Sequence, residues 1–224
     1  DAVARQIGKE PYEVRLANLP RAEQMPFDNV TNKHFDSGDY PGLLNKAVEA
    51  IDVAGVRARQ KRGEPDGRLI GLGISIFSEQ TGHGTTADGK RRVFYEQTFA
   101  RITPDGRLEV RNGIQAIGQG LETTLAQIAS ECLGVDTANV VVRLGDTENS
   151  PYSSGAWGSR SIVWAGGSTA RACKELAKRV AVIGAAMLQT DVNSVQVRDG
   201  GVYGPHGNVS LADIARAYYL TPAD

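Results

Sequence analysis

The stretch LEVRNGIQAIGQGLETTLAQIASECL, residues 108–133, decides the fold, because a strand pattern changes into a helix pattern inside it. Leu108 and Val110 alternate with charged residues, which predicts a half-buried strand. The apolar residues of 121–133 then recur with the 3.6-residue period of a helix, and Gly134 follows as a C-cap. A strand that leads into a helix within a few residues is typical of domains that combine both elements.

The segments around this stretch carry patterns of the same kinds. The turn signal Thr103-Pro104-Asp105-Gly106 predicts a hairpin that ends in the strand at 108. Other strands are predicted at 69–77, 93–102 and 140–144, and as a hairpin at 195–203. Helices are predicted at 1–20 with a break at Pro11, at 41–62, at 168–188, and after Ser210, which would cap the last one.

These elements predict an α+β (α/β-like) fold, with one mixed sheet, helices packed on it and a helical N-terminal lead-in. The expected division is a lead-in over 1–66 and an α/β domain over 67–224. Hydrophobic residues make up 41% and charged residues 23% of the 224, which is enough apolar material for a buried core.

Charge and composition exclude several classes of protein. The net charge of -1 gives no reason to expect nucleic acid or an anionic membrane as a partner. No apolar stretch approaches the ~20 residues needed to span a bilayer, and no signal peptide is visible, so a cytoplasmic protein is expected. The three histidines are scattered without ligand spacing, which predicts no metal site made of protein ligands.

The first candidate site is the turn between the strand at 108 and the helix at 121. Gly118 and Gly120 let the backbone approach a ligand closely, and the free N–H groups of the helix start favour an anion. Gln119 adds an amide, and Thr123 either caps the first turn or offers its hydroxyl. Neither a phosphate loop nor a dinucleotide fingerprint is complete here, so an ordinary tight turn stays an equal alternative.

The second candidate site is the Ser/Gly-rich segment 145–167, predicted to be a loop before the long helix. It carries Ser159, Arg160 and Ser161, and the guanidinium of Arg160 suits a phosphate. Two such loops at neighbouring strand ends indicate one ligand with several polar groups. The alternative is a mobile surface loop.

With both loops considered, the sequence resembles the molybdopterin-binding subunit of the xanthine dehydrogenase, aldehyde oxidase and aerobic carbon monoxide dehydrogenase family. The resemblance covers nearly the whole chain in the right order. The motifs that carry it are GQGLxTxxxQIA at 118–129, LGV at 133–135, GDT at 145–147, GSRS at 158–161 and DxxAxxxGxxPxxxRxxN at 1–18.

The resemblance implies a piece of a molybdenum hydroxylase, an oxidoreductase that hydroxylates an aldehyde, an N-heterocycle or a similar electron-poor carbon with water. It implies molybdopterin as cofactor, in some members as the cytosine dinucleotide, with [2Fe–2S] and FAD carried by partner subunits. The cofactor-binding residues would be Gly118, Gln119, Gly120, Thr123, Ser159, Arg160 and Ser161.

The family's catalytic glutamate has no counterpart here, since its motif would lie beyond Asp224. No catalytic residue is therefore assigned, and no turnover is expected from this chain without the remainder of its subunit. Two other hypotheses stay open: a non-catalytic scaffold domain that keeps the fold without the cofactor, and an ordinary nucleotide-binding domain, which the missing fingerprints disfavour.

Overall fold

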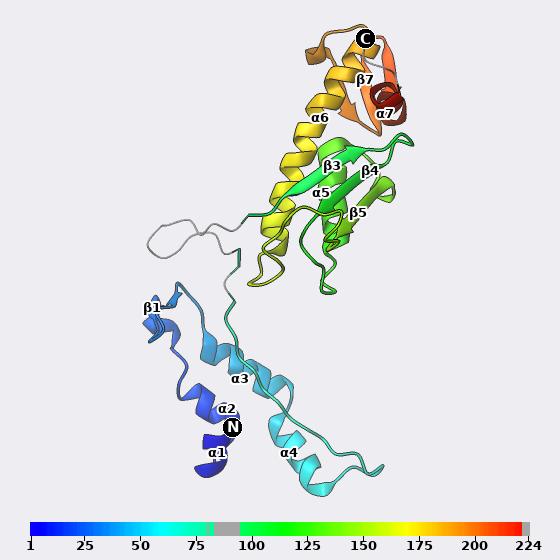
Figure 1. Cartoon of the computed structure of the whole chain (residues 1–224). Helices are drawn as coiled ribbons and strands as arrows, with labels where there is room; N and C mark the ends of the chain where they lie inside the picture. Colours follow the sequence, from blue (N-terminus) through cyan, green and yellow to red (C-terminus); the bar gives the residue numbers. More distant parts are fainter. Residues whose placement is uncertain (80, 83–94, 221–224) are drawn as a thin grey trace. The chain divides into compact units, whose positions relative to one another are not determined.

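The computed structural model describes residues 1–79, 81–82 and 95–220 (Figure 1). The chain forms two compact units, Asp1–Ser78 and Glu79–Asp224. The predicted division at residue 66 stays a prediction. Among the described residues, no helix is both long and apolar enough to cross a membrane.

The first unit is built from short helices with little buried core. Its helices are α1 (Ala2–Gln6), α2 (Pro11–Leu16), α3 (Tyr40–Ala50) and α4 (Val53–Arg62), with a 3-10 turn at Ala22–Gln24. Its strands, β1 (Phe27–Asp28) and β2 (His34–Phe35), pair antiparallel. Proline at the first position of α2 fits the predicted break in the N-terminal helix, because proline lacks the N–H that a helix interior needs.

The prediction of one continuous helix over 41–62 is wrong, because Asp52 separates α3 from α4. Asp52 adopts a left-handed conformation (φ 50°), and its carboxylate accepts a hydrogen bond from Gly55 N–H at 3.0 Å. Aspartate tolerates this conformation and is a strong N-cap, so it starts a new helix instead of continuing the old one.

The prediction of a strand at 69–77 is also wrong. No strand is present there, because a strand needs a hydrogen-bonded neighbour and none of the described residues supplies one. The period of two is nevertheless visible in the burial of the segment: half-buried and exposed residues alternate from Ile70 to Phe77.

The second unit is centred on a three-stranded mixed sheet. Its strands are β3 (Thr98–Ile102), β4 (Leu108–Asn112) and β5 (Val140–Leu144). The predicted hairpin is confirmed, since β3 and β4 pair antiparallel, and β5 adds to β4 in parallel. The helices α5 (Leu121–Leu133) and α6 (Gly167–Met187) pack on one face of this sheet (Figure 1). The core between them includes Leu108, Val110, Ala129, Leu133 and Cys173.

A small antiparallel sheet and a last helix complete this unit. The strands are β6 (Gln196–Arg198), β7 (Gly201–Gly204) and β8 (Gly207–Ser210), and α7 (Leu211–Leu220) follows. The hairpin of β6 and β7 was predicted, whereas β8 was not. The cap at Ser210 is confirmed, because its Oγ accepts the N–H of Asp213 at 3.1 Å. The fold class is confirmed as α+β, but the described strands form three sheets instead of the one mixed sheet that was expected, and only the sheet of β3, β4 and β5 is mixed.

Two predicted boundaries change. The helix at the end of the Ser/Gly-rich segment begins earlier than predicted, because a π-helical turn at Ile162–Gly166 runs directly into α6. The strand predicted from residue 93 begins at Thr98, and residues 93 and 94 lie outside the described part of the chain. In contrast, α5 has the predicted bounds, and Gly134 ends it in the left-handed conformation.

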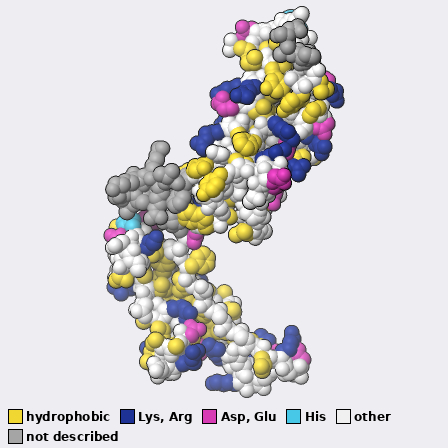
Figure 2. Space-filling view, in the orientation of Figure 1, with side chains coloured by type: hydrophobic (Ala, Val, Ile, Leu, Met, Phe, Trp, Pro, Cys, Tyr) yellow, Lys and Arg dark blue, Asp and Glu magenta, His cyan; other side chains and the backbone are white. Residues whose placement is uncertain are grey.

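The sheet face opposite the helices is charged. Glu109 lies at its centre and forms ion pairs with Arg101, Arg111 and Arg143 at 2.6, 2.7 and 3.1 Å. Burial raises the pKa of Glu109, but the hydrogen bonds from Arg111 and Arg101 outweigh it and hold the pKa below its usual value. Lys and Arg side chains gather over these strands in the space-filling view (Figure 2).

Candidate functional site

Both predicted site loops leave the same edge of the central sheet. Since β4 and β5 are parallel, with Asn112 beside Leu144, the segments that follow them start side by side. We name residues 113–120 the glycine loop and residues 145–161 the serine loop. Ligands of open α/β sheets bind outside the carboxyl ends of parallel strands, which is where these loops lie.

The two loops touch each other, which the prediction of a shared ligand requires. A Cβ on Gly113 would overlap the carbonyl oxygen of Pro151, and a Cβ on Gly145 would overlap the side-chain oxygen of Gln115. Gly113 is therefore needed for close packing, because it meets the backbone of the other loop, whereas the exposed Gln115 side chain could turn away from a Cβ at position 145. Beneath the loops lies an apolar cluster of Ile114, Leu121, Leu125 and Ala165.

The glycine loop is exposed and shaped for close approach to its backbone. Gly118 and Gly120 have φ values of 96° and 75°, and a Cβ on either would meet no atom within 4 Å. Gly120 precedes α5 without any side-chain cap, so the first N–H groups of the helix are free for an anion. The side chain of Gln119 folds back, and its Oε1 accepts the N–H of Ile117 at 2.7 Å.

Thr123 does not cap the first turn of α5. The hydroxyl that bonds there belongs to Thr124, which donates to the carbonyl of Gly120 at 2.9 Å. Thr123 is exposed on the same turn, which leaves the other expected role, a hydroxyl offered to a ligand.

In the serine loop, Ser159 has a strained backbone. Its φ of 49° is in the left-handed region, which costs a non-glycine residue about 1–2 kcal/mol. Residues held in such conformations cluster at functional sites. Its Oγ donates to Glu79 at 3.0 Å and is otherwise exposed. Ser161 is half-buried and starts the π-helical turn that precedes α6.

Arg160 was predicted to offer its guanidinium to a phosphate, and the structure places it in the protein interior. Its side chain is 0% exposed, and Nη1 donates to Glu96 Oε1 and to the carbonyl of Gly155, both at 2.6 Å. The rings of Trp157 and Trp164 lie 5.4 and 5.8 Å from its Cζ, within cation–π range.

This buried pair leaves polar atoms unsatisfied at the edge where the loops meet. Nε and Nη2 of Arg160, Oε2 of Glu96 and Oγ of Ser150 are buried and have no hydrogen-bond partner. An unpaired buried polar atom costs about 1–3 kcal/mol, so each one calls for a partner. The open space beside the two glycines and the uncapped start of α5 fit a polar, anionic cofactor.

Glu96 is the site residue that the sequence did not reveal. It precedes β3, is 64 residues from Arg160 in the sequence, and also accepts the N–H of Ser154 at 3.3 Å. Nothing local to Glu96 distinguishes it from a surface carboxylate. Only the fold brings it under the serine loop.

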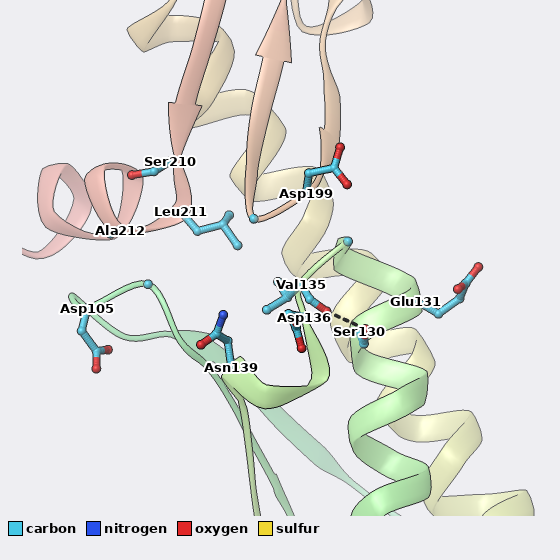
Figure 3. Close-up of a pocket in the computed structure, with 13 residues that line it drawn as sticks. Asp105, Ser130, Glu131, Val135, Asp136, Asn139, Asp199, Ser210, Leu211 and Ala212 are labelled. Atoms are coloured by element: carbon cyan, nitrogen blue, oxygen red, sulfur yellow. Dashed lines mark hydrogen bonds between the residues drawn. The ribbon is translucent and has the colours of Figure 1, made fainter.

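A cavity of about 690 Å³ lies at the other end of the sheet (Figure 3). Its walls include four carboxylates, from Asp105, Glu131, Asp136 and Asp199, and none of its described lining residues is Lys, Arg or His. Asp105 and Glu131 lie on opposite sides of the opening in Figure 3. Such a wall repels an anion, and its carboxylates do not converge on a point.

The described residues hold no group of three or more His, Cys, Asp or Glu side chains placed to bind a metal ion. Burial raises the pKa of the Cys173 thiol to about 12 and also raises that of Cys132. Neither is a thiolate near neutral pH, which fits their place in the core.

Comparison with known proteins agrees with the geometry. Residues 46–224 match the model of the molybdopterin cofactor-binding domain. The chain is 34% identical over 232 residues to the carbon monoxide dehydrogenase large chain of Hydrogenophaga pseudoflava, covering 100% of this chain and 29% of that protein. It is 31% identical over 225 residues to the nicotine 6-hydroxylase large subunit of Paenarthrobacter nicotinovorans, covering 98% and 27%.

Among solved structures, quinoline 2-oxidoreductase from Pseudomonas putida 86 is similar, with 34% sequence identity and a TM-score of 0.58. The alignment covers 98% of this chain and 29% of that one. The chain thus spans less than a third of the length of the relatives it matches.

Proposed function

Because this chain belongs to the molybdopterin cofactor-binding domains of the molybdenum hydroxylase family, we propose that it forms one wall of the cofactor site in a larger oxidoreductase. The observation that carries the proposal is the contact between the glycine loop and the serine loop at the carboxyl ends of β4 and β5. Loops that leave the carboxyl ends of adjacent parallel strands can contact the same ligand.

The proposed contacts follow from exposure and donor chemistry. Open space borders the Cα positions of Gly118 and Gly120, and the exposed residues Gln119 and Thr123 lie beside them in the sequence. Ser159 adds a second exposed hydroxyl from the serine loop. These groups suit the pterin and phosphate parts of the cofactor, which offer donors, acceptors and negative charge.

Arg160 and Ser161 lie deeper in the protein than the groups above, since Arg160 is buried and Ser161 is half-buried. The carbonyl of Gly155 and the carboxylate of Glu96 hold the buried guanidinium under the loop. Ser161 links this residue to the helical turn below it. Their proposed task is to fix the loop and its charge.

The bound cofactor would supply molybdenum redox chemistry for hydroxylating an electron-poor carbon with water. The relatives are named for nicotine, quinoline and carbon monoxide, so an aldehyde, an N-heterocycle or a similar small substrate is proposed. The cytosine dinucleotide form of molybdopterin, partner subunits with [2Fe–2S] and FAD, and a cytoplasmic location complete the proposal. This chain's residues bind and orient; none is assigned a catalytic step.

The test uses the full-length parent protein. Gln119→Ala and Gly120→Val are compared with Gln196→Ala, an exposed glutamine in β6 far from both loops. Molybdenum and pterin are measured per purified subunit. We expect roughly tenfold weaker cofactor retention in the two loop variants, as for other residues that orient a metal centre. Cofactor retention in the control should equal that of the native protein.

Two results contradict the proposal in different ways. Full molybdenum content in both loop variants would refute the residue roles. A parent protein that carries neither molybdenum nor pterin when isolated from its own source would favour a scaffold domain without cofactor.

A further inference from the structure

Asn112, the last residue of β4, is fully buried and hydrogen-bonded through both ends of its amide. Its Oδ1 accepts the N–H of Ile114, in the glycine loop, at 2.9 Å. Its Nδ2 donates to Thr98 Oγ1 at 2.9 Å and to Ser168 Oγ at 3.3 Å. One side chain therefore joins the start of the glycine loop to the first turn of α6.

The hydroxyl groups extend this connection toward the serine loop. Thr98 Oγ1 lies 2.8 Å from Ser168 Oγ and 3.2 Å from Thr169 Oγ1. Ser168 Oγ also contacts the carbonyl of Ala165 at 3.0 Å. Ala165 belongs to the π-helical turn that directly follows the serine loop. The cluster is thus bonded to the glycine loop and to the π-helical turn that follows the serine loop. Asn112 and Thr169 are fully buried, whereas Thr98 is half-buried.

We propose that Asn112 is a positioning residue that sets the spacing of the two cofactor loops. This inference rests on the proposed function. The N–H of Ile114 needs an acceptor, and the hydroxyls of Thr98 and Ser168 need a partner that can donate to them, so an amide satisfies all three at once. Without the amide of Asn112, no side-chain hydrogen bond among the described residues connects the glycine loop to α6. The main-chain amides of the loop then no longer face the ligand in a fixed geometry.

The experiment measures how fast molybdenum and pterin leave the full-length holoenzyme after dilution and gel filtration. Asn112→Leu keeps the branched shape of the side chain and removes every side-chain hydrogen bond. Val110→Ala, buried two residues earlier on the same strand, is the matched control for lost stability. We expect roughly tenfold faster release from Asn112→Leu, the scale seen for residues that orient a metal centre indirectly. The control should lower the melting temperature without changing the release rate.

A conservative variant separates positioning from general destabilisation. In Asn112→Asp, a protonated carboxyl keeps an acceptor for the N–H of Ile114 and a donor for the hydroxyl of Thr98, so slow release should return at a pH below the pKa of this buried acid. If Asn112→Leu does not fold, Thr98→Val decides, because it removes the shorter of the two hydrogen bonds that Asn112 Nδ2 donates and keeps the bond to Ile114. Release from it should then be faster than from the native protein.

Equal release rates for Asn112→Leu and Val110→Ala would overturn the inference, as would native release from Thr98→Val. Gln119→Ala, measured in parallel, distinguishes the two proposals. If Gln119→Ala releases cofactor quickly and Asn112→Leu does not, the positioning role alone is refuted. If neither differs from the native protein, the role proposed for Gln119 is refuted as well.

Discussion

Replacing Glu96 by alanine removes the counter-charge of a guanidinium that water cannot reach. Both side chains of the pair are 0% exposed, and the Nη1–Oε1 distance is 2.6 Å. After the change, Arg160 keeps its hydrogen bond to the carbonyl of Gly155, and Ser154 N–H loses its carboxylate partner. The chain is left with a buried, nearly unpaired positive charge.

The unpaired buried charge determines how much folding stability is lost. Breaking one side of a buried ion pair costs about 3–5 kcal/mol, a large part of the 5–15 kcal/mol that holds a typical domain together. Arg160→Met should cost a similar amount, because it strands the carboxylate of Glu96. Replacing both, as Glu96→Leu with Arg160→Met, removes both charges and should cost only about 2 kcal/mol for the backbone groups left unpaired.

The assay is guanidinium denaturation of the 224-residue chain, followed by tryptophan fluorescence. The chain has two tryptophans, and both rings lie within 6 Å of the guanidinium, so the signal reports on this part of the second unit. The double variant should be more stable than either single variant by at least about 1 kcal/mol. A loss in the double variant equal to the sum of the two single losses would refute the reasoning, as would a Glu96→Ala cost below about 1 kcal/mol.

Three further outcomes are expected. Gly184→Ala should destabilise the second unit by about 1–3 kcal/mol in thermal unfolding, because its Cβ would lie 2.6 Å from Val202, whereas Gly167→Ala in the same helix meets nothing within 4 Å and should be neutral or slightly stabilising. Hydrogen bonds from a threonine hydroxyl and an arginine on the same turn lower the pKa of Asp105 from 3.8 to about 2. The stability that Asp105 contributes is therefore complete above pH 4 and is lost as the pH falls through 2. An NMR titration midpoint near 4 for Asp105 would contradict this. Cys173 should resist a thiol reagent at pH 8 until the protein unfolds, and rapid labelling of the native chain would exclude its burial.

Elements set by local signals were predictable from the sequence. The helix α5 begins and ends at the predicted residues, because its apolar period and the left-handed Gly134 act within a few residues of each other. The hairpin of β3 and β4 follows from its turn residues in the same way. In contrast, the strand expected at 69–77 depends on a neighbour that no local pattern specifies, and it has none among the described residues.

The residues of the candidate site also divide into those that a local sequence signal predicts and those whose surroundings depend on distant parts of the chain. Gly118 and Gly120 were predictable, because a strand that turns into a helix needs backbone freedom there. The environment of Arg160 was not, since its partner Glu96 is 64 residues away and the pair forms only after β3 joins β4. The sequence around an arginine does not tell whether its side chain is exposed or buried. The cationic group at position 160 was therefore predicted, but its burial was not.

The buried polar groups explain why this edge of the sheet suits a ligand better than the acidic cavity at the other edge. Exposed glycines alone would give a mobile loop that loses entropy when it closes on a cofactor. Here, the ion pair of Glu96 and Arg160 fixes one loop and the amide of Asn112 fixes the other, so much of that ordering is complete before binding. Preorganised donors hold a charged ligand more strongly than flexible ones, because they need no rearrangement when it arrives. The buried residues beneath the loops are therefore what distinguishes the proposed cofactor site from an ordinary tight turn.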